Sequence, residues 1–293
     1  MTIAYPALRR CCLTVPGSSP RMLAKAASIA VDELVLDLED GVVAAEKESA
    51  RAAVVAALTG SALEGRQVAV RVNAIGTPWC HDDIVALAAI ARDRLSLVLP
   101  KVESAADIGF VERLLPDVEA ADRPTDIGLQ CLIETAAGLA GVASIAAAGG
   151  RLEGLVIGYG DLASSLGYGA DVDWSFVQQT VLLAARVNGI DAIDGPYFAL
   201  GSAAAEAGLA RACLQAAGFG FDGKWAIHPA QVATITSSFM PTEAELARAE
   251  AIVRKLDAAR SGGAGVALLD GSMIDEAMRL GAMRILARAR TAQ

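Results

Sequence analysis

The sequence has few of the residues that zinc, disulfide and nucleic-acid sites require. Only two histidines, His81 and His228, occur in 293 residues, and the five cysteines show no CxxC spacing, which argues against zinc. An odd number of cysteines favours reduced thiols in a cytoplasmic protein. Basic residues are outnumbered, with 25 Lys and Arg against 34 Asp and Glu. The sequence therefore predicts no basic face for nucleic acid.

Long apolar runs are also missing. The longest weakly polar stretch, from Leu139 to Gly150, is too short and too rich in glycine and alanine to cross a bilayer. The N-terminal residues around Arg9 and Arg10 lack the apolar centre of a signal peptide. The expectation is a soluble cytoplasmic protein with no membrane span.

Short apolar runs alternate instead with helical segments along most of the chain. Ile108, Val111 and Leu115 recur on one helical face behind a Ser104 N-cap. A later helix is predicted to bury one face, formed by Phe176, Thr180, Val181, Ala184 and Val187. Eight runs are predicted strands: Cys11–Pro16, Glu33–Glu39, Gln67–Asn73, Ser96–Val102, Ile127–Glu134, Gly154–Asp161, Ala192–Tyr197 and Lys224–Pro229. Eight βα units match a (β/α)8 TIM barrel, and an open doubly wound sheet is the alternative.

The predicted barrel, residues 9–240, leaves a C-terminal segment that a barrel does not need. Thr242 and Glu245 form a capping box that starts a helix with a stripe of Leu246, Ala249, Val253 and Leu256. A glycine-rich break at 261–265 then precedes a last helix. Residues 241–293 are therefore predicted to form a helical arm that packs on a neighbouring subunit.

Polar residues cluster where the predicted strands end, which in a barrel is the catalytic face. They are Asp37, Glu39, Asp40, Arg71, Lys101, Glu134, Asp161, Asp194 and His228. Packed carboxylates repel one another unless a cation relieves them. Oxygen ligands favour Mg²⁺, with Mn²⁺ possible, held by one or two carboxylates together with waters and substrate.

Each of these residues also has a structural interpretation. Glu134 and Asp161 could cap the helices that follow them. Arg71 could neutralise Glu39 or Asp40, with or without a second role in binding substrate. The remaining structural assignments are Asp37, Glu39 and Asp40 as supporting residues, His228 as a packed loop residue, and Ser272 with Asp275 as a capping box for the last helix.

Seven motifs, in this order, resemble the citrate lyase β-subunit family of the HpcH/HpaI aldolase superfamily, which includes malyl-CoA and citramalyl-CoA lyases. The resemblance covers about residues 9–280. The motifs are Val15-Pro-Gly-Ser18, Leu36-Asp-Leu-Glu-Asp-Gly41, Val70-Arg-Val-Asn73, Leu99-Pro-Lys-Val-Glu103, Ile133-Glu-Thr135, Gly160-Asp-Leu162 and Ala226-Ile-His-Pro229.

The resemblance implies a TIM barrel, a Mg²⁺ ion and reversible carbon–carbon cleavage of a 3-hydroxyacyl thioester. The metal ligands of the family align with Glu134 and Asp161, and its substrate-binding arginine aligns with Arg71. Gly160, Asp161 and Lys25 fall at further substrate-binding positions. Gly271-Ser-Met-Ile-Asp275 matches a motif whose aspartate is an acid/base given by a neighbouring subunit, which implies a homotrimer or homohexamer.

Two positions depart from the family pattern. Ser19 stands where malyl-CoA lyases commonly carry an arginine, so one contact with a CoA phosphate is not expected here. Ala277 replaces a proline that is often found two residues after the C-terminal aspartate. These departures weaken an assignment to malyl-CoA itself more than an assignment to the family.

The predicted function is a Mg²⁺-dependent lyase that cleaves a malyl-CoA-like or citramalyl-CoA-like thioester. Its products would be an acyl-CoA and a 2-oxo acid such as glyoxylate or pyruvate. The alternatives are a citryl-thioester lyase acting on an acyl-carrier protein, a CoA-independent 2-keto acid aldolase, and a catalytically silent binding protein. Thioester hydrolysis after condensation would be a side reaction of the same site.

Overall fold

The chain forms two compact units in the computed structural model, which describes residues 8–121, 126–169 and 171–289. The barrel unit begins at Arg9 and ends at Thr236, and the C-terminal unit begins at Ser237. The division falls within helix α10 (Val232–Phe239), near the predicted boundary at residue 240.

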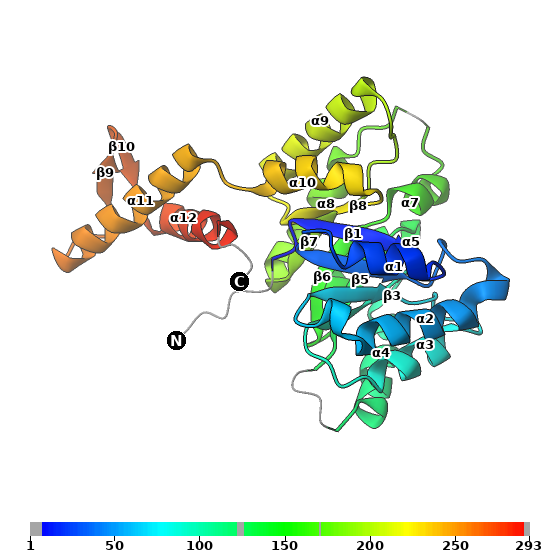
Figure 1. The fold of residues 1–293 in the computed structure, drawn as a ribbon. Helices are drawn as coiled ribbons and strands as arrows, with labels where there is room; N and C mark the ends of the chain where they lie inside the picture. The colour runs from blue at the N-terminus through cyan, green and yellow to red at the C-terminus, as the bar shows by residue number, and fades with distance from the viewer. Residues whose placement is uncertain (1–7, 122–125, 170, 290–293) are drawn as a thin grey trace. The chain divides into compact units, whose positions relative to one another are not determined.

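Eight parallel strands close into a barrel in chain order, with β8 pairing with β1 (Figure 1). The predicted TIM barrel is confirmed, and the open doubly wound sheet is wrong because an open sheet would leave two unpaired edges. The strands are β1 (Cys11–Pro16), β2 (Glu33–Asp37), β3 (Val68–Arg71), β4 (Leu95–Leu99), β5 (Gly128–Ile133), β6 (Leu152–Ile157), β7 (Asp191–Asp194) and β8 (Gly223–Ala226).

Helices connect successive strands and surround the barrel in Figure 1. The predicted N-cap at Ser104 is confirmed, and the structure adds Asp107, which forms a capping box with it. The helices of the barrel unit are α1 (Pro20–Ala26), α2 (Lys47–Thr59), α3 (Cys80–Ala88), α4 (Ala105–Val118), α5 (Ala136–Ala140), α6 (Val142–Ala146), α7 (Tyr159–Leu166), α8 (Ser175–Asn188) and α9 (Ala203–Phe219), with 3₁₀ turns η1 (Ala44–Glu46), η2 (Ser61–Leu63) and η3 (Pro229–Gln231).

One apolar residue from each strand forms a buried cluster inside the barrel. The cluster contains Cys12, Val35, Ala69, Val98, Leu132, Val156, Ile193 and Trp225. Because side chains alternate along a strand, residues two positions away lie on the same face of the sheet. Asp37, Arg71 and Glu134 follow cluster members by two positions. The same alternation therefore places these three side chains together at the carboxyl end of the barrel.

The opposite end of the barrel is closed by a buried polar network. Arg9 donates to Glu33 (Nε–Oε1 2.9 Å) and to Asp191 (Nη1–Oδ2 2.8 Å). Gln67 and Gln130 donate to the same Glu33 oxygen, at 2.9 and 3.0 Å. These groups bind one another toward the amino ends of the strands, so the polar residues of the two ends form separate sets.

The C-terminal unit packs α11 (Glu243–Ser261) against α12 (Glu276–Arg288) and a hairpin of β9 (Ala267–Leu269) and β10 (Ser272–Ile274). The predicted Thr242–Glu245 capping box starts α11. The hairpin was not predicted. Its turn has positive φ at Asp270 (50°) and Gly271 (77°), the type I′ geometry that an Asp-Gly pair favours.

The predicted buried face of α8 is partly wrong. The helix buries Val177, Val181, Ala184 and Ala185, whereas Phe176 and Val187 are 70% and 75% exposed. Apolar residues lie around much of this helix, so its periodicity allows two overlapping faces and packing on the barrel selects one.

No helix within the described part of the chain combines the length and apolar character needed to cross a membrane.

Candidate active site

The carboxyl ends of the strands bring together most of the predicted site residues. Arg71 is the last residue of β3, Glu134 directly follows β5, and Lys101 lies two residues beyond β4. Asp161 lies in the first turn of α7 rather than in a strand, because β6 ends before Gly158. Arg71 and Lys101 both contact Glu39, in the acidic segment that follows β2. Lys101 also contacts Asp161 through its ammonium and Glu134 through its backbone amide.

Arg71 is held by a two-pronged ion pair with Asp37. Its Nε and Nη2 each donate to one Asp37 carboxylate oxygen at 2.7 Å. Asp37 also accepts from the amides of Glu39 and Gly41, both at 2.9 Å. Burial acts to lower the pKa of Arg71, but the bonds and charge of Asp37 outweigh it and raise that pKa. Asp37 is thus a supporting residue, as predicted.

The third nitrogen of the Arg71 guanidinium faces a different carboxylate. Nη1 lies 2.9 Å from Glu39 Oε2, yet that buried oxygen makes no hydrogen bond of good geometry. Arg71 therefore neutralises Asp37 and Glu39. The sequence predicted Glu39 or Asp40 as the ion-pair partner of Arg71. Its side chain is 13% exposed, so Nη1 keeps donor capacity toward the mouth of the barrel.

Lys101 connects the carboxylates on both sides of the mouth. Its ammonium lies 3.0 Å from Glu39 Oε1, 3.4 Å from Asp161 Oδ2 and 3.7 Å from Asp40 Oδ1. Its backbone has a φ of 53°, and its amide donates to Glu134 Oε1 at 2.8 Å. The sequence identified Lys101 only as a cation at a strand end, because a left-handed backbone at a lysine has no pattern in the sequence.

Glu134 is a buried carboxyl group with an altered pKa. The residue is 3% exposed, and its pKa is raised to about 7, first by burial and then by the charge of Glu39. The proposed capping role is wrong, because Thr135 caps α5 through its own hydroxyl. Nothing in the helix therefore requires the Glu134 carboxylate.

Asp161 does not cap α7 either. The N-cap is Gly158, and Asp161 sits inside the first turn, where the helix dipole favours a negative charge. Its side chain is 43% exposed and faces the Lys101 ammonium. Gly158 allows Glu134 and α7 to approach closely, because a Cβ on Gly158 would lie 2.4 Å from Glu134 Oε2.

Two residues expected at the mouth have other contacts. Asp194 is 1% exposed and pairs with Lys224 (Nζ–Oδ2 2.5 Å) while accepting from the Tyr159 hydroxyl and from Gln178. Its expected place among the mouth carboxylates is therefore wrong. His228 is exposed and accepts from the Ala230 amide at 3.1 Å, so it is a loop residue as expected but is not packed.

The two remaining substrate-binding predictions fall on exposed residues of helices α1 and α7. Lys25 lies in the last turn of α1 with its side chain exposed. Gly160 is the second residue of α7, and a Cβ there would meet only the Phe198 ring, at 3.6 Å. Within the described residues, neither contacts the group formed by Arg71, Lys101 and Glu134, so both assignments stay predictions.

In the C-terminal unit, Asp275 is itself the N-cap of α12. Its Oδ1 accepts from the Met278 amide at 3.2 Å. The predicted capping box is wrong in its first member, because Ser272 belongs to β10 rather than to the cap. Asp275 is half-buried, so its carboxylate is accessible while it caps the helix.

The residues at the mouth fit a hard divalent cation. No group of three or more ligand-type side chains forms a ready metal cage among the described residues, but Mg²⁺ commonly takes only one or two carboxylates. A cation of the protein's own, the Lys101 ammonium, already lies among Glu39, Asp40 and Asp161. The pKa of Glu134 is raised first by burial and then by the charge of Glu39, and a bound cation would favour its ionised form.

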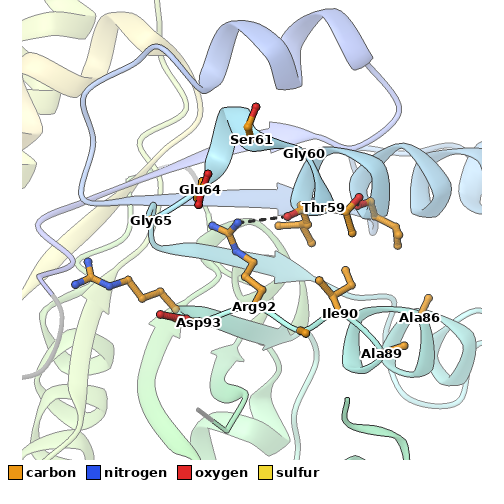
Figure 2. A pocket seen from close by; sticks show the side chains of 14 residues that line it. Thr59, Gly60, Ser61, Glu64, Gly65, Ala86, Ala89, Ile90, Arg92 and Asp93 are labelled. Carbon is orange, nitrogen blue, oxygen red and sulfur yellow. Dashed lines mark hydrogen bonds between the residues drawn. The ribbon is translucent and has the colours of Figure 1, made fainter. Parts of the chain in front are cut away.

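A groove of about 900 Å³ lies elsewhere on the barrel unit (Figure 2). It is lined by the segments that lead into β3 and β4, including Gly60, Glu64 and Ile90, and so lies at the amino ends of those strands. Arg92 in this groove donates to the carbonyls of Leu63 and Arg66, at 2.6 and 2.7 Å. The groove is thus remote from the carboxylates of the mouth. Arg92 has a structural role there, because it holds the Leu63 and Arg66 carbonyls through hydrogen bonds.

A closed parallel barrel that gathers carboxylates and an arginine at the carboxyl ends of its strands defines a class of enzymes whose chemistry lies at that mouth. Residues 10–229 match the HpcH/HpaI aldolase/citrate lyase family, and the chain belongs to this family. The predicted resemblance and the predicted enzyme class, a carbon–carbon lyase, are both confirmed.

Two relatives and one solved structure illustrate matches over nearly the whole chain. An L-malyl-CoA/beta-methylmalyl-CoA lyase of Rhodobacter capsulatus is 34% identical, covering 92% of this chain and 90% of that protein. A (3S)-malyl-CoA thioesterase of Cereibacter sphaeroides is 37% identical, covering 96% and 94%. The structure of CitE from Mycobacterium tuberculosis in complex with magnesium, acetoacetate and coenzyme A is 32% identical, with a TM-score of 0.74, covering 97% and 98%.

Proposed function

We propose that this chain is a Mg²⁺-dependent lyase that reversibly cleaves a malyl-CoA-like or citramalyl-CoA-like thioester into an acyl-CoA and a 2-oxo acid such as glyoxylate or pyruvate. The observation that carries the proposal is the convergence of Arg71, Glu134 and Asp161 on one mouth. Relatives named for a malyl-CoA thioester match nearly the whole chain, and a similar structure was solved with magnesium and coenzyme A.

Glu134 and Asp161 would hold the metal ion. When bound, such an ion polarises carbonyl and alkoxide oxygens as a Lewis acid, which is worth several kcal/mol. Arg71 would bind the carboxylate of the 2-oxo acid through Nη1, because a guanidinium matches the planar geometry of a carboxylate. Asp37 keeps Arg71 in place through its two bonds at 2.7 Å.

Asp275 would move the proton at carbon. In cleavage, the substrate hydroxyl loses its proton to solvent and its oxygen becomes the carbonyl oxygen of the 2-oxo acid. The bond between the hydroxyl-bearing carbon and the carbon next to the thioester breaks, and its electron pair goes to the thioester enolate. The protonated Asp275 gives its proton to that enolate and yields the acyl-CoA. In condensation, the Asp275 carboxylate removes a proton from the same carbon.

Asp275 belongs to the C-terminal unit, and we propose that a neighbouring subunit supplies it. Leu268 and Met273 face each other across the hairpin of that unit and are 66% and 63% exposed. Adjacent exposed apolar side chains favour a protein partner. A homotrimer or homohexamer would satisfy this arrangement, and each active site would then combine residues of two chains.

Hydrolysis of malyl-CoA is a second candidate function. The 37% identity to a thioesterase favours it. In that reaction water attacks the thioester carbonyl, and the products are malate and free coenzyme A thiol. The lyase reaction releases no thiol, so the two activities differ in a directly measurable product.

The test incubates purified protein with malyl-CoA and Mg²⁺ and follows acetyl-CoA and glyoxylate by mass spectrometry and free thiol by colorimetry. The expected result is acetyl-CoA and glyoxylate without free thiol, and loss of both products in EDTA. Free thiol with no acetyl-CoA would replace the lyase by the thioesterase. Failure with all free CoA esters would favour a carrier-protein thioester or a CoA-independent aldolase.

The metal assignment is tested by Asp161→Asn, which keeps shape and removes charge. We expect turnover to fall by at least about 10²-fold and Mn²⁺ binding, followed by electron paramagnetic resonance, to weaken in parallel. Asp82→Asn, on a side chain that is 63% exposed on α3, is the matched control and should change neither quantity. Normal Mn²⁺ binding in Asp161→Asn would contradict the assignment.

A further inference from the structure

Lys101 contacts both predicted metal ligands through different parts of the residue. Its amide bonds Glu134 Oε1 at 2.8 Å, and its ammonium lies 3.4 Å from Asp161 Oδ2. The same ammonium is 3.0 Å from Glu39 Oε1. This lysine thus links the two ligands to each other and to the acidic segment after β2.

The backbone of Lys101 adopts a conformation that residues with a side chain rarely adopt. Its φ of 53° is positive, and residues other than glycine rarely occupy this region. The conformation directs the amide to Glu134. The side chain is 38% exposed and ends in a flexible four-carbon stem, so the amide is fixed while the ammonium has room to leave.

We infer that Lys101 is the resident counter-ion of the metal-free active site, and that its ammonium must leave Asp161 when a divalent cation binds, while its amide keeps Glu134 in place. The inference rests on the proposed metal centre of Glu134 and Asp161. Lys101 is in this sense a positioning residue that also sets the affinity for the metal.

Charge and geometry indicate that the Lys101 ammonium, and not Arg71, moves when a metal ion binds. A divalent cation on Asp161 and an ammonium 3.4 Å from one of its oxygens repel each other strongly in a partly buried site. Arg71 cannot yield in the same way, because its fork on Asp37 is bidentate and its side chain is only 13% exposed. Lys101 is therefore the cation that moves.

The experiment measures Mn²⁺ affinity without substrate in wild type, Lys101→Met and Lys101→Arg. If the ammonium competes with the metal, Lys101→Met binds Mn²⁺ about tenfold or more tightly, and its metal-free form unfolds at a lower temperature than wild type. Lys101→Arg keeps the positive charge, so its affinity should stay within a few-fold of wild type.

A second variant guards against a folding defect. Lys101→Gly also removes the ammonium but keeps the amide and accepts a positive φ without strain, so it should bind Mn²⁺ more tightly too. Unchanged or weaker binding in a folded Lys101→Met or Lys101→Gly protein would overturn the inference. Absence of Mn²⁺ binding in wild type would instead overturn the proposed metal centre, and the inference with it.

Discussion

Each cation at the mouth of the barrel has defined carboxylate partners, and the partners determine what the cation can do. Arg71 gives two of its nitrogens to Asp37 and turns the third toward Glu39. Lys101 divides one ammonium among Glu39, Asp40 and Asp161. A fixed arginine beside a lysine shared among three carboxylates suits the proposed site, which would bind both a carboxylate and a metal ion.

The fork of Arg71 can be tested by Arg71→Lys. A lysine ammonium is a point charge that cannot make both bonds to Asp37, so we expect the KM for the 2-oxo acid to rise at least about tenfold. The lost buried bonds should also lower the free energy of unfolding by about 1–3 kcal/mol. Steady-state kinetics and urea unfolding measure the two effects. Arg113→Lys, on the exposed side of α4, is the control, and an unchanged KM in Arg71→Lys would exclude substrate binding by this residue.

The cysteines should be inert in the folded protein. All five are buried, and burial raises the pKa of Cys80 to about 11 and that of Cys11 to about 12. Because the thiolate is the reactive form, a raised pKa leaves about 10⁻³ or less of these two thiols ionised at pH 8.

Iodoacetamide at pH 8 should therefore label none of the cysteines of the native protein in the time that labels all five in guanidinium. Peptide mass spectrometry identifies the sites. Raising the pH toward 10 should make Cys80 react before Cys11, since two pH units increase the thiolate fraction of a thiol with a pKa of about 11 by about a hundredfold. Rapid labelling of any one cysteine in the native protein would show that its strand or helix opens.

At the scale of elements, the turns after the strands place the functional groups. Strand β6 ends at Ile157 and α7 begins at Tyr159, so Gly158 alone makes the turn. The missing side chain of Gly158 leaves space for Glu134. The same tight turn carries Asp161 toward Lys101.

Gly158→Ala should therefore damage the site, while Gly160→Ala should not damage the fold. A Cβ at 158 would lie 2.4 Å from Glu134 Oε2, so we expect weaker Mn²⁺ binding and a lower unfolding temperature. A Cβ at 160 makes an ordinary contact of 3.6 Å and improves helix propensity by up to about 1 kcal/mol. Equal unfolding temperatures for the two variants would contradict this account of the turn.

Substitutions of Asp275, the N-cap of α12, can separate a capping role from a catalytic role. Asn is as good an N-cap as Asp, so Asp275→Asn should leave the free energy of unfolding within about 0.5 kcal/mol of wild type. If Asp275 is the acid/base, turnover should fall by about 10²–10⁴-fold.

Asp275→Ala removes both functions and should in addition cost about 1 kcal/mol of stability. Turnover assays and chemical unfolding of the three proteins distinguish the roles. Full turnover in Asp275→Asn would leave Asp275 with a capping role only.

At the scale of the whole molecule, the chain separates its proposed chemistry between two units. Arg71, Glu134 and Asp161 belong to the barrel unit, and Asp275 belongs to the C-terminal unit. Complementation between inactive subunits tests whether a site combines two chains.

Glu134→Gln and Asp275→Asn subunits should each be inactive alone. If Asp275 is supplied by a neighbour, mixed oligomers formed by co-expression in equal amounts contain about one intact site in four by random assembly. Activity should then recover to about a quarter of wild type. If each chain used its own Asp275, no site would be intact, and no recovery would be seen in oligomers shown by mass spectrometry to be mixed.

Much of this arrangement could be predicted from local sequence. The eight apolar runs, the N-cap at Ser104, the capping box at Thr242 and the polar strand ends follow from periodicity and side-chain chemistry within a few residues of one another. The same local patterns place Arg71 and Glu134 at the carboxyl ends of β3 and β5. The family motifs then supply the expectation of a metal site and a lyase.

The sequence by itself thus determined the alternation of strands and helices and the chemical character of the mouth. Only the tertiary structure decided which charges meet, because ion pairs depend on residues brought together from different strands. Asp37 pairs with Arg71, and Asp194 pairs with Lys224. Lys101, whose backbone is in the left-handed region, contacts both Glu134 and Asp161. Packing likewise decided which face of α8 is buried, since several faces of that helix were apolar enough to pack on the barrel.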